Sequence, residues 1–195
     1  MLTIKAIRTI IRQGLRDELQ ESVDAEFADD ELDLHINEVL VEISQKRPYE
    51  VKETVVSDGT KEVDISDITN LLEVEKAEYP TGSDPPDYRD VSAFGGTLRL
   101  NIDTTPTSGA NVYLYCHKVH QLTESSSTLK PDLEKVLIEG AVAKAAMAWL
   151  NKMREQIVPS SIRLYQSWAT TQLMLYQNSL NSIRRPRVWE FYPRG

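Results

Sequence analysis

The sequence predicts an α+β protein: a bundle of about four helices with an inserted antiparallel β wing and an extended C-terminal arm. Apolar residues recur at helical spacing near the start of the chain and again after about residue 130. Between these segments, from about 50 to 122, alternating runs are separated by turn residues. We expect one domain over 1–182 and an arm over 183–195.

Composition is consistent with that class. The chain has 195 residues, 41% of them hydrophobic, which is enough for the core of one domain. No apolar run approaches the roughly 18 residues that would span a bilayer, and the first residues lack the pattern of a secretory signal. A single cysteine, Cys116, excludes an internal disulfide and fits a reducing compartment.

The first helix is expected over 3–20, because Ile7, Ile11 and Leu15 fall on one face at helical spacing. Four basic residues share a neighbouring face: Lys5, Arg8, Arg12 and Arg16. This basic stripe is either a solvated face or a contact with another subunit. A second helix is expected over 29–46, where Asp29 or Asp30 is placed to accept hydrogen bonds from the amides of its first turn.

The β wing begins with two alternating runs around Asp58-Gly59, which predict a hairpin because glycine tolerates positive φ. Further strands are expected over 71–79, 88–94, 97–102 and 111–119. A third helix is expected over 130–153, with Thr128 as its cap. Its many small residues predict a buried central helix, and a fourth helix follows over 160–181.

No segment predicts a catalytic centre, and we expect no enzyme activity, no cofactor and no metal. The sequence has no phosphate loop, dinucleotide fingerprint or nucleophile elbow. His117 and His120 would point to opposite faces of one strand, which favours an ordinary strand end over a metal site. The basic ends and acidic middle of the chain suit contacts with protein surfaces better than wrapping of nucleic acid.

The C-terminal arm invites a functional interpretation, because arginines and large aromatics dominate binding energy at interfaces. In an extended conformation its aromatic side chains at 189 and 191 share a face, and such a segment can add to the edge of a partner's sheet. The alternative is that the arm folds back on its own domain. The candidate partner-binding residues are Arg184, Arg185, Arg187, Trp189, Phe191 and Tyr192.

The whole pattern resembles the head–tail connector (adaptor) proteins of tailed bacteriophages, from about Leu2 to Asn181. The order and spacing of loose motifs carry the resemblance. They are residues 27–40, residues 72–80 before a Pro-rich turn, residues 98–101 with 112–115 and His117, and residues 127–137 leading to helices that contain Tyr165 and Trp168.

The resemblance implies a structural protein that forms a ring, twelve-fold in the virion, beneath the portal at the head–tail junction. Its partners would be the portal, a tail, stopper or neck protein, and other copies of itself, and DNA would pass through the channel without specific binding. Such a protein is made in the cytoplasm of the bacterial host and has no membrane partner. Two alternatives stay open: another phage neck or tail-completion protein, and a small host enzyme or regulatory binding domain.

Overall fold

The structure is a computed structural model that describes residues 2–19, 27–153 and 159–183. The chain divides into two compact units. The helical unit comprises residues 1–47 and 120–195, and the β unit comprises Pro48–Val119. Helices with antiparallel sheets confirm the predicted α+β class. The inserted β unit lies close to the range of about 50–122 that the alternating pattern predicted.

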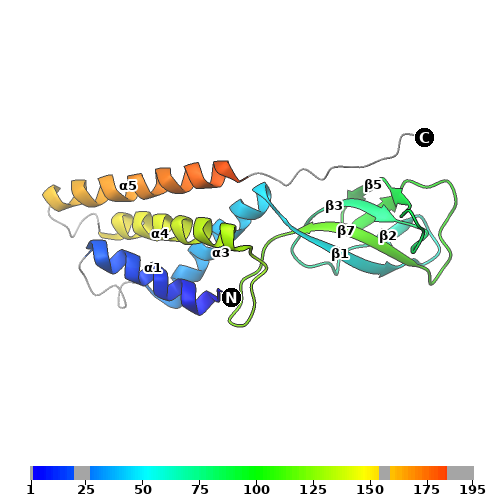
Figure 1. Ribbon diagram of the computed structural model, residues 1–195, viewed down its shortest axis with the longest axis horizontal. Helices are drawn as coiled ribbons and strands as arrows, with labels where there is room; N and C mark the ends of the chain where they lie inside the picture. The colour runs from blue at the N-terminus through cyan, green and yellow to red at the C-terminus, as the bar shows by residue number, and fades with distance from the viewer. Residues whose placement is uncertain (1, 20–26, 154–158, 184–195) are drawn as a thin grey trace. The chain divides into compact units, whose positions relative to one another are not determined.

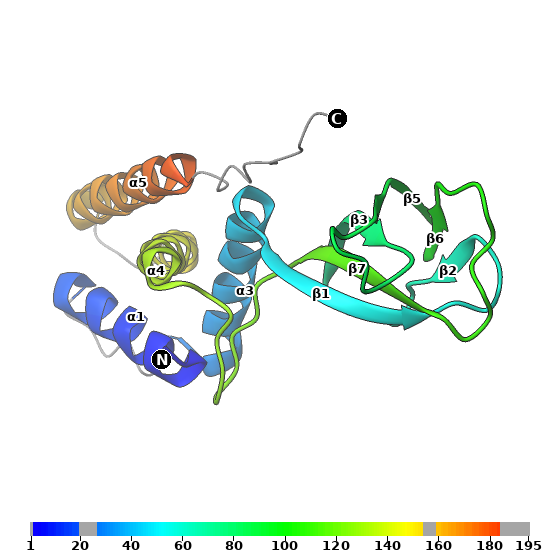
Figure 2. The same cartoon turned by 45° about the vertical axis from the view of Figure 1, so that its right-hand side comes forward.

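Four described helices form the helical unit: α1 (Ile4–Leu19), α3 (Asp29–Lys46), α4 (Pro131–Met153) and α5 (Pro159–Ser182). Helix α4 lies among the other three, and Figure 2 shows it nearly end-on between α1, α3 and α5. The predicted apolar stripe of α1 is buried at Ile7, Ile11 and Leu15. Hydrophobic spacing therefore identified the core face of this helix correctly.

The predicted small residues make α4 the central helix. Four of its alanines are buried: Ala141, Ala143, Ala145 and Ala146. At Gly140 a Cβ would lie 2.5 Å from Cε2 of Tyr176 on α5 and 2.8 Å from Cγ1 of Val39 on α3. Both neighbouring helices therefore approach α4 more closely at this point than any side chain would permit.

The start of α3 agrees with the prediction in part, and the start of α4 differs from it. Ala28 is the N-cap of α3 and gives no side-chain cap, but Asp30 Oδ1 accepts a hydrogen bond from the first-turn amide of Glu31 at 3.1 Å, as predicted. Thr128 does not sit at the cap position of α4, which begins at Pro131. Its hydroxyl instead accepts the Gln121 amide at 2.8 Å and lies 3.1 Å from Nδ1 of His120. Thr128 therefore stabilises the connection before α4 and does not cap the helix.

The β unit contains two antiparallel sheets. The first has the order β1 (Tyr49–Val56), β7 (Asn111–Lys118), β3 (Leu71–Glu78) and β4 (Tyr88–Arg89). The second has the order β2 (Glu62–Asp64), β6 (Thr97–Leu100) and β5 (Val91–Phe94). In Figure 1, β1, β7 and β3 run side by side. A shared core joins the sheets, with Leu98 and Leu100 from one and Val112 and Leu114 from the other.

The predicted hairpin at Asp58-Gly59 is wrong. Strand β1 pairs along its full length with β7, whereas β2 pairs with β6 in the other sheet. Gly59 does have a φ of +94°, so the turn exists, but it connects two sheets. Asp58-Gly59 correctly predicted a turn of the chain, but these residues do not determine which strands pair.

The single strand expected over 88–94 is two strands, β4 and β5, that belong to different sheets. The chain leaves the first sheet at Asp90, which separates them. A tight turn through Gly95 and Gly96, both at positive φ (59° and 83°), then joins β5 to β6. This turn places Phe94 at the tip of a hairpin.

Candidate interaction surfaces

Part of the predicted basic stripe forms ion pairs within the chain. Arg8 of α1 donates from Nε to Asp33 Oδ1 at 2.7 Å and from its guanidinium to Asp29 Oδ2 at 2.9 Å. Arg12 donates to Asp29 Oδ1 at 2.7 Å and to the carbonyl oxygen of Phe27 at 3.0 Å. These contacts fasten α1 to α3. The hydrogen bond from Arg12 holds the pKa of the Asp29 carboxyl below its ordinary value.

The other two residues of the stripe differ. Lys5 is exposed on α1 and forms no ion pair with the described residues. Arg16 lies in α1, but its side chain is outside the described part of the structure. Because the structure holds one chain, the predicted subunit contact of the stripe stays a prediction.

Sequence reasoning missed a charged cluster that connects three helices. Lys144 of α4 donates to Glu42 Oε1 of α3 at 2.8 Å, and the Tyr176 hydroxyl of α5 donates to the other oxygen of Glu42. Burial raises the pKa of Glu42, but the hydrogen bonds from Lys144 and Tyr176 outweigh burial and lower it overall. A lysine within an alanine-rich buried helix was the available signal, since a buried ammonium requires a partner.

Helix α5 leaves large apolar side chains uncovered. Leu164 is 70% exposed, and Met174 and Leu175 are more than half exposed. Leu164 and Leu175 are eleven residues apart, which places them on the same face at about 100° per residue. Exposed apolar side chains aligned along a helix mark a candidate contact surface.

The β unit carries most of the net charge. Residues 48–119 contain 13 acidic and 6 basic side chains, hence −7, of the total of −8. Its largest exposed apolar side chain is Phe94, at 91% exposure on the hairpin tip. Because aromatic side chains are enriched among the residues that dominate binding energy, Phe94 is a candidate contact residue.

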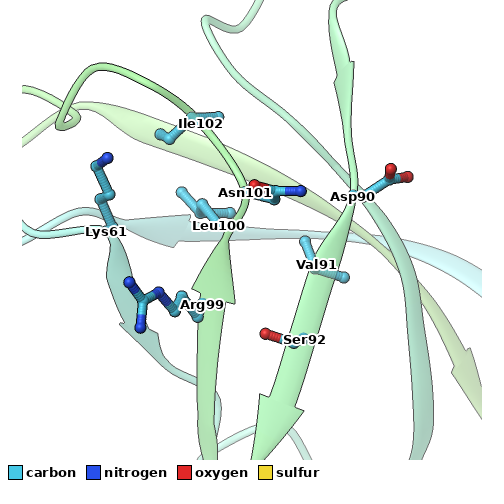
Figure 3. A pocket seen from close by; sticks show the side chains of 8 residues that line it. All are labelled: Lys61, Asp90, Val91, Ser92, Arg99, Leu100, Asn101 and Ile102. Carbon is cyan, nitrogen blue, oxygen red and sulfur yellow. The ribbon is translucent and has the colours of Figure 1, made fainter.

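A cavity of about 260 Å³ lies near that hairpin, between β5, β6 and the segment before β2. Figure 3 shows the side chains of Lys61 and Arg99 on one side and Asp90 on the other. Lys61 Nζ donates to the carbonyl oxygen of Asp103 at 3.0 Å, so the cavity wall is partly fixed. With Ser92 and Asn101 also in the lining, the cavity presents charged and hydrogen-bonding side chains.

The two histidines singled out in the sequence belong to different units. His117 lies on β7, with Nδ1 3.5 Å from Glu73 Oε2 and Nε2 3.4 Å from Glu75 Oε2. His120 lies beyond the end of β7 in the helical unit, where its Nε2 is 3.0 Å from the carbonyl oxygen of Arg47. Burial lowers the pKa of His120. The ring is buried and hydrogen-bonded, so it contributes to packing at the start of the segment that leads to α4.

The six candidate partner-binding residues of the arm lie outside the described residues: Arg184, Arg185, Arg187, Trp189, Phe191 and Tyr192. Within the described ranges, no three His, Cys, Asp or Glu side chains gather as a metal-binding group. In the same ranges, no helix combines the length and the hydropathy that a transmembrane span needs.

Comparisons with known proteins find similarity among solved structures but not among sequences. No family model matches the sequence, and no curated protein matches it. Among solved structures, the chain is similar to one from the "Neck of empty GTA particle computed with C6 symmetry". The two sequences are 11% identical, the TM-score is 0.30, and the match covers 93% of this chain and 92% of that chain.

Proposed function

We propose that this protein is a structural head–tail connector of a tailed bacteriophage. It forms a ring, twelve-fold in the virion, beneath the portal, where it extends the DNA channel and docks tail or stopper proteins. It acts by assembly and without turnover of a substrate. The sequence motifs that resemble connector proteins support this proposal, and so do the exposed surfaces of both units.

The main observation behind the proposal is that each unit leaves large apolar side chains exposed. Leu164 and Leu175 on α5 and Phe94 on the β hairpin are exposed, although the chain has a well-filled core. Such side chains are costly in water and are the residues that bury on association. A protein with separate contact surfaces on two units suits a role between neighbours in an assembly.

The charge distribution supports passage of DNA without binding. An acidic surface repels the phosphate backbone, whereas retention would require a continuous basic patch. The β unit has a net charge of −7, and two basic residues of α1, Arg8 and Arg12, are held by acids of α3. The assembled ring should therefore let DNA slide through without specific contacts.

Reconstitution with the portal of the same particle tests the proposal. Light scattering and negative-stain imaging should show rings of this chain alone or on the portal, and imaging of purified particles should place it at the head–tail junction. Leu175→Glu on α5 should reduce ring formation or portal binding at least tenfold, since a buried charge at an interface is costly. Gln177→Glu is the matched control, because Gln177 is exposed on the same helix and the substitution adds the same negative charge.

Two results would contradict the proposal. One is a chain that stays monomeric and does not bind the portal at any concentration. The other is that the chain is absent from purified particles, which would favour a role in the host instead.

A further inference from the structure

Strand β1 is an open edge of its sheet. All eight of its residues pair with β7, and in the described part of the chain no strand pairs with its other side. An edge of this length presents a row of backbone N–H and C=O groups that can accept another strand. The side chains at the edge include half-buried Val51 and Val55 on the core face and exposed Lys52 on the outer face.

The C-terminal arm contains a segment with the composition of a strand. Residues Arg187–Tyr192 lie between Pro186 and Pro193 and read Arg-Val-Trp-Glu-Phe-Tyr. β-branched and aromatic residues favour strands, and the two prolines would limit pairing to these six residues.

Charge favours contact between this segment and the β unit. Residues 184–195 contain four arginines and one glutamate, hence +3, whereas the β unit has −7. An antiparallel register that sets Glu190 opposite Lys52 also sets Phe191 opposite Val51, on the core face of the edge. In the same register Arg187 lies opposite Val55 and diagonally from Glu53, whose Oε1 already accepts a hydrogen bond from Lys118 Nζ. The alignment therefore matches one charge pair, Glu190 with Lys52, and one apolar pair, Phe191 with Val51.

We propose that Arg187–Tyr192 of one copy adds to the free edge of β1 in the next copy, in this antiparallel register. The proposal rests on the ring inferred above and specifies how neighbouring copies are linked. The segment of one copy and the edge of the next are different surfaces, so the contact is head-to-tail, and repeated contacts of this kind form a ring when the rotation between copies closes. The sequence left open whether the arm binds the portal or a neighbouring subunit, and this proposal assigns it to the neighbouring subunit.

A mixing experiment tests the link between copies. A ¹⁵N-labelled chain that ends at Ile183 offers the β1 edge but has no arm, and an unlabelled full-length chain supplies arms. Amides of β1 that point away from β7 should exchange at least about tenfold more slowly in the mixture than in the labelled chain alone. Unlabelled Trp189→Pro is the matched control, because it keeps the length and charge of the arm but interrupts the strand.

A charge exchange tests the register. Lys52→Glu in the labelled chain should weaken the interaction about twofold to fivefold, because it places a like charge opposite Glu190. Glu190→Lys in the unlabelled chain should restore it. If Lys52→Glu has no effect, the proposed register is wrong.

Three outcomes would overturn the inference while leaving the connector proposal standing. The β1 amides could exchange equally fast with and without the full-length chain, although rings form. The Trp189→Pro chain could protect them as well as the unaltered chain does. Chains that end at Ile183 could form rings with the affinity of the full-length protein. Failure of both the full-length and the shortened chain to assemble, with or without portal, would instead refute the connector proposal.

Discussion

Replacing Gly140 by alanine should destabilise the helical unit, although alanine is the better helix former. The added Cβ would lie 2.5 Å and 2.8 Å from Cε2 and Cδ2 of Tyr176 and 2.8 Å from Cγ1 of Val39. Contacts under 3.0 Å require neighbouring groups to move, and Tyr176 is almost fully buried, so the displacement reaches the α4–α5 packing. Moving Tyr176 also disturbs its hydrogen bond to Glu42.

The magnitude follows from opposing contributions. Overpacking of a filled core costs about 1–3 kcal/mol. Disturbing a hydrogen bond to a charged group costs about 1.5 kcal/mol. The helix propensity of alanine offsets about 1 kcal/mol of these costs. We expect a net loss of about 2 kcal/mol in the free energy of unfolding, or about 4–8 °C in Tm for a protein of this size.

Gly14→Ala is the matched control for this prediction. Gly14 also lies within a helix, but a Cβ there would lie 3.8 Å from Cγ2 of Val142, which is an ordinary contact. This variant should gain up to about 1 kcal/mol. Urea unfolding followed by the helical circular dichroism signal measures both variants. If Gly140→Ala is as stable as Gly14→Ala, α5 does not pack closely against α4 at Gly140.

Three further variants test other contacts. Arg8→Met removes two hydrogen bonds to Asp33 and one to Asp29 and should cost about 1–3 kcal/mol of unfolding free energy, whereas Lys5→Met on the same helix should change it by less than about 0.5 kcal/mol. Equal effects in urea unfolding would contradict a role of the Arg8 ion pairs in joining α1 to α3. Burial lowers the pKa of His120, so the stability contributed by the neutral ring is complete above the ordinary histidine pKa of 6.5 and is lost as pH falls through the pKa of the folded protein. His120→Gln should therefore show a flatter dependence of unfolding free energy on pH below about pH 6.5, and an unchanged slope would contradict this reasoning. Phe94→Ser should leave the unfolding free energy within about 0.5 kcal/mol of the original, because the ring is exposed, while ring or portal binding falls about tenfold or more; a stability loss without a binding loss would place Phe94 in the fold.

Local pattern was sufficient for most elements. Spacing of apolar residues located α1 and α3 and the buried face of α1, since a helix must bury one stripe wherever it packs. Helix-start residues and small side chains located α4 and α5. Alternation likewise located β3, β6 and β7, because each has one face on the core. The small residues of α4 correctly indicated the central helix.

Pairing and contact were beyond the reach of local pattern. The turn at Asp58-Gly59 suggested a hairpin, yet β1 pairs with β7 more than fifty residues later. The cluster of Glu42, Lys144 and Tyr176 joins three helices, and its members are separated by up to 134 residues. The ion pairs of Arg8 and Arg12 appear in the sequence only as a basic stripe.

The sequence by itself determined the α+β class, the places of helices and strands, and the acidic balance, because these depend on neighbours within a few residues. Only the tertiary structure decided which strands pair, which charges are neutralised within the chain, and which apolar side chains stay exposed. Those properties depend on groups brought together by the fold, since burial and electrostatic interaction are set by distance in space and not by separation along the chain.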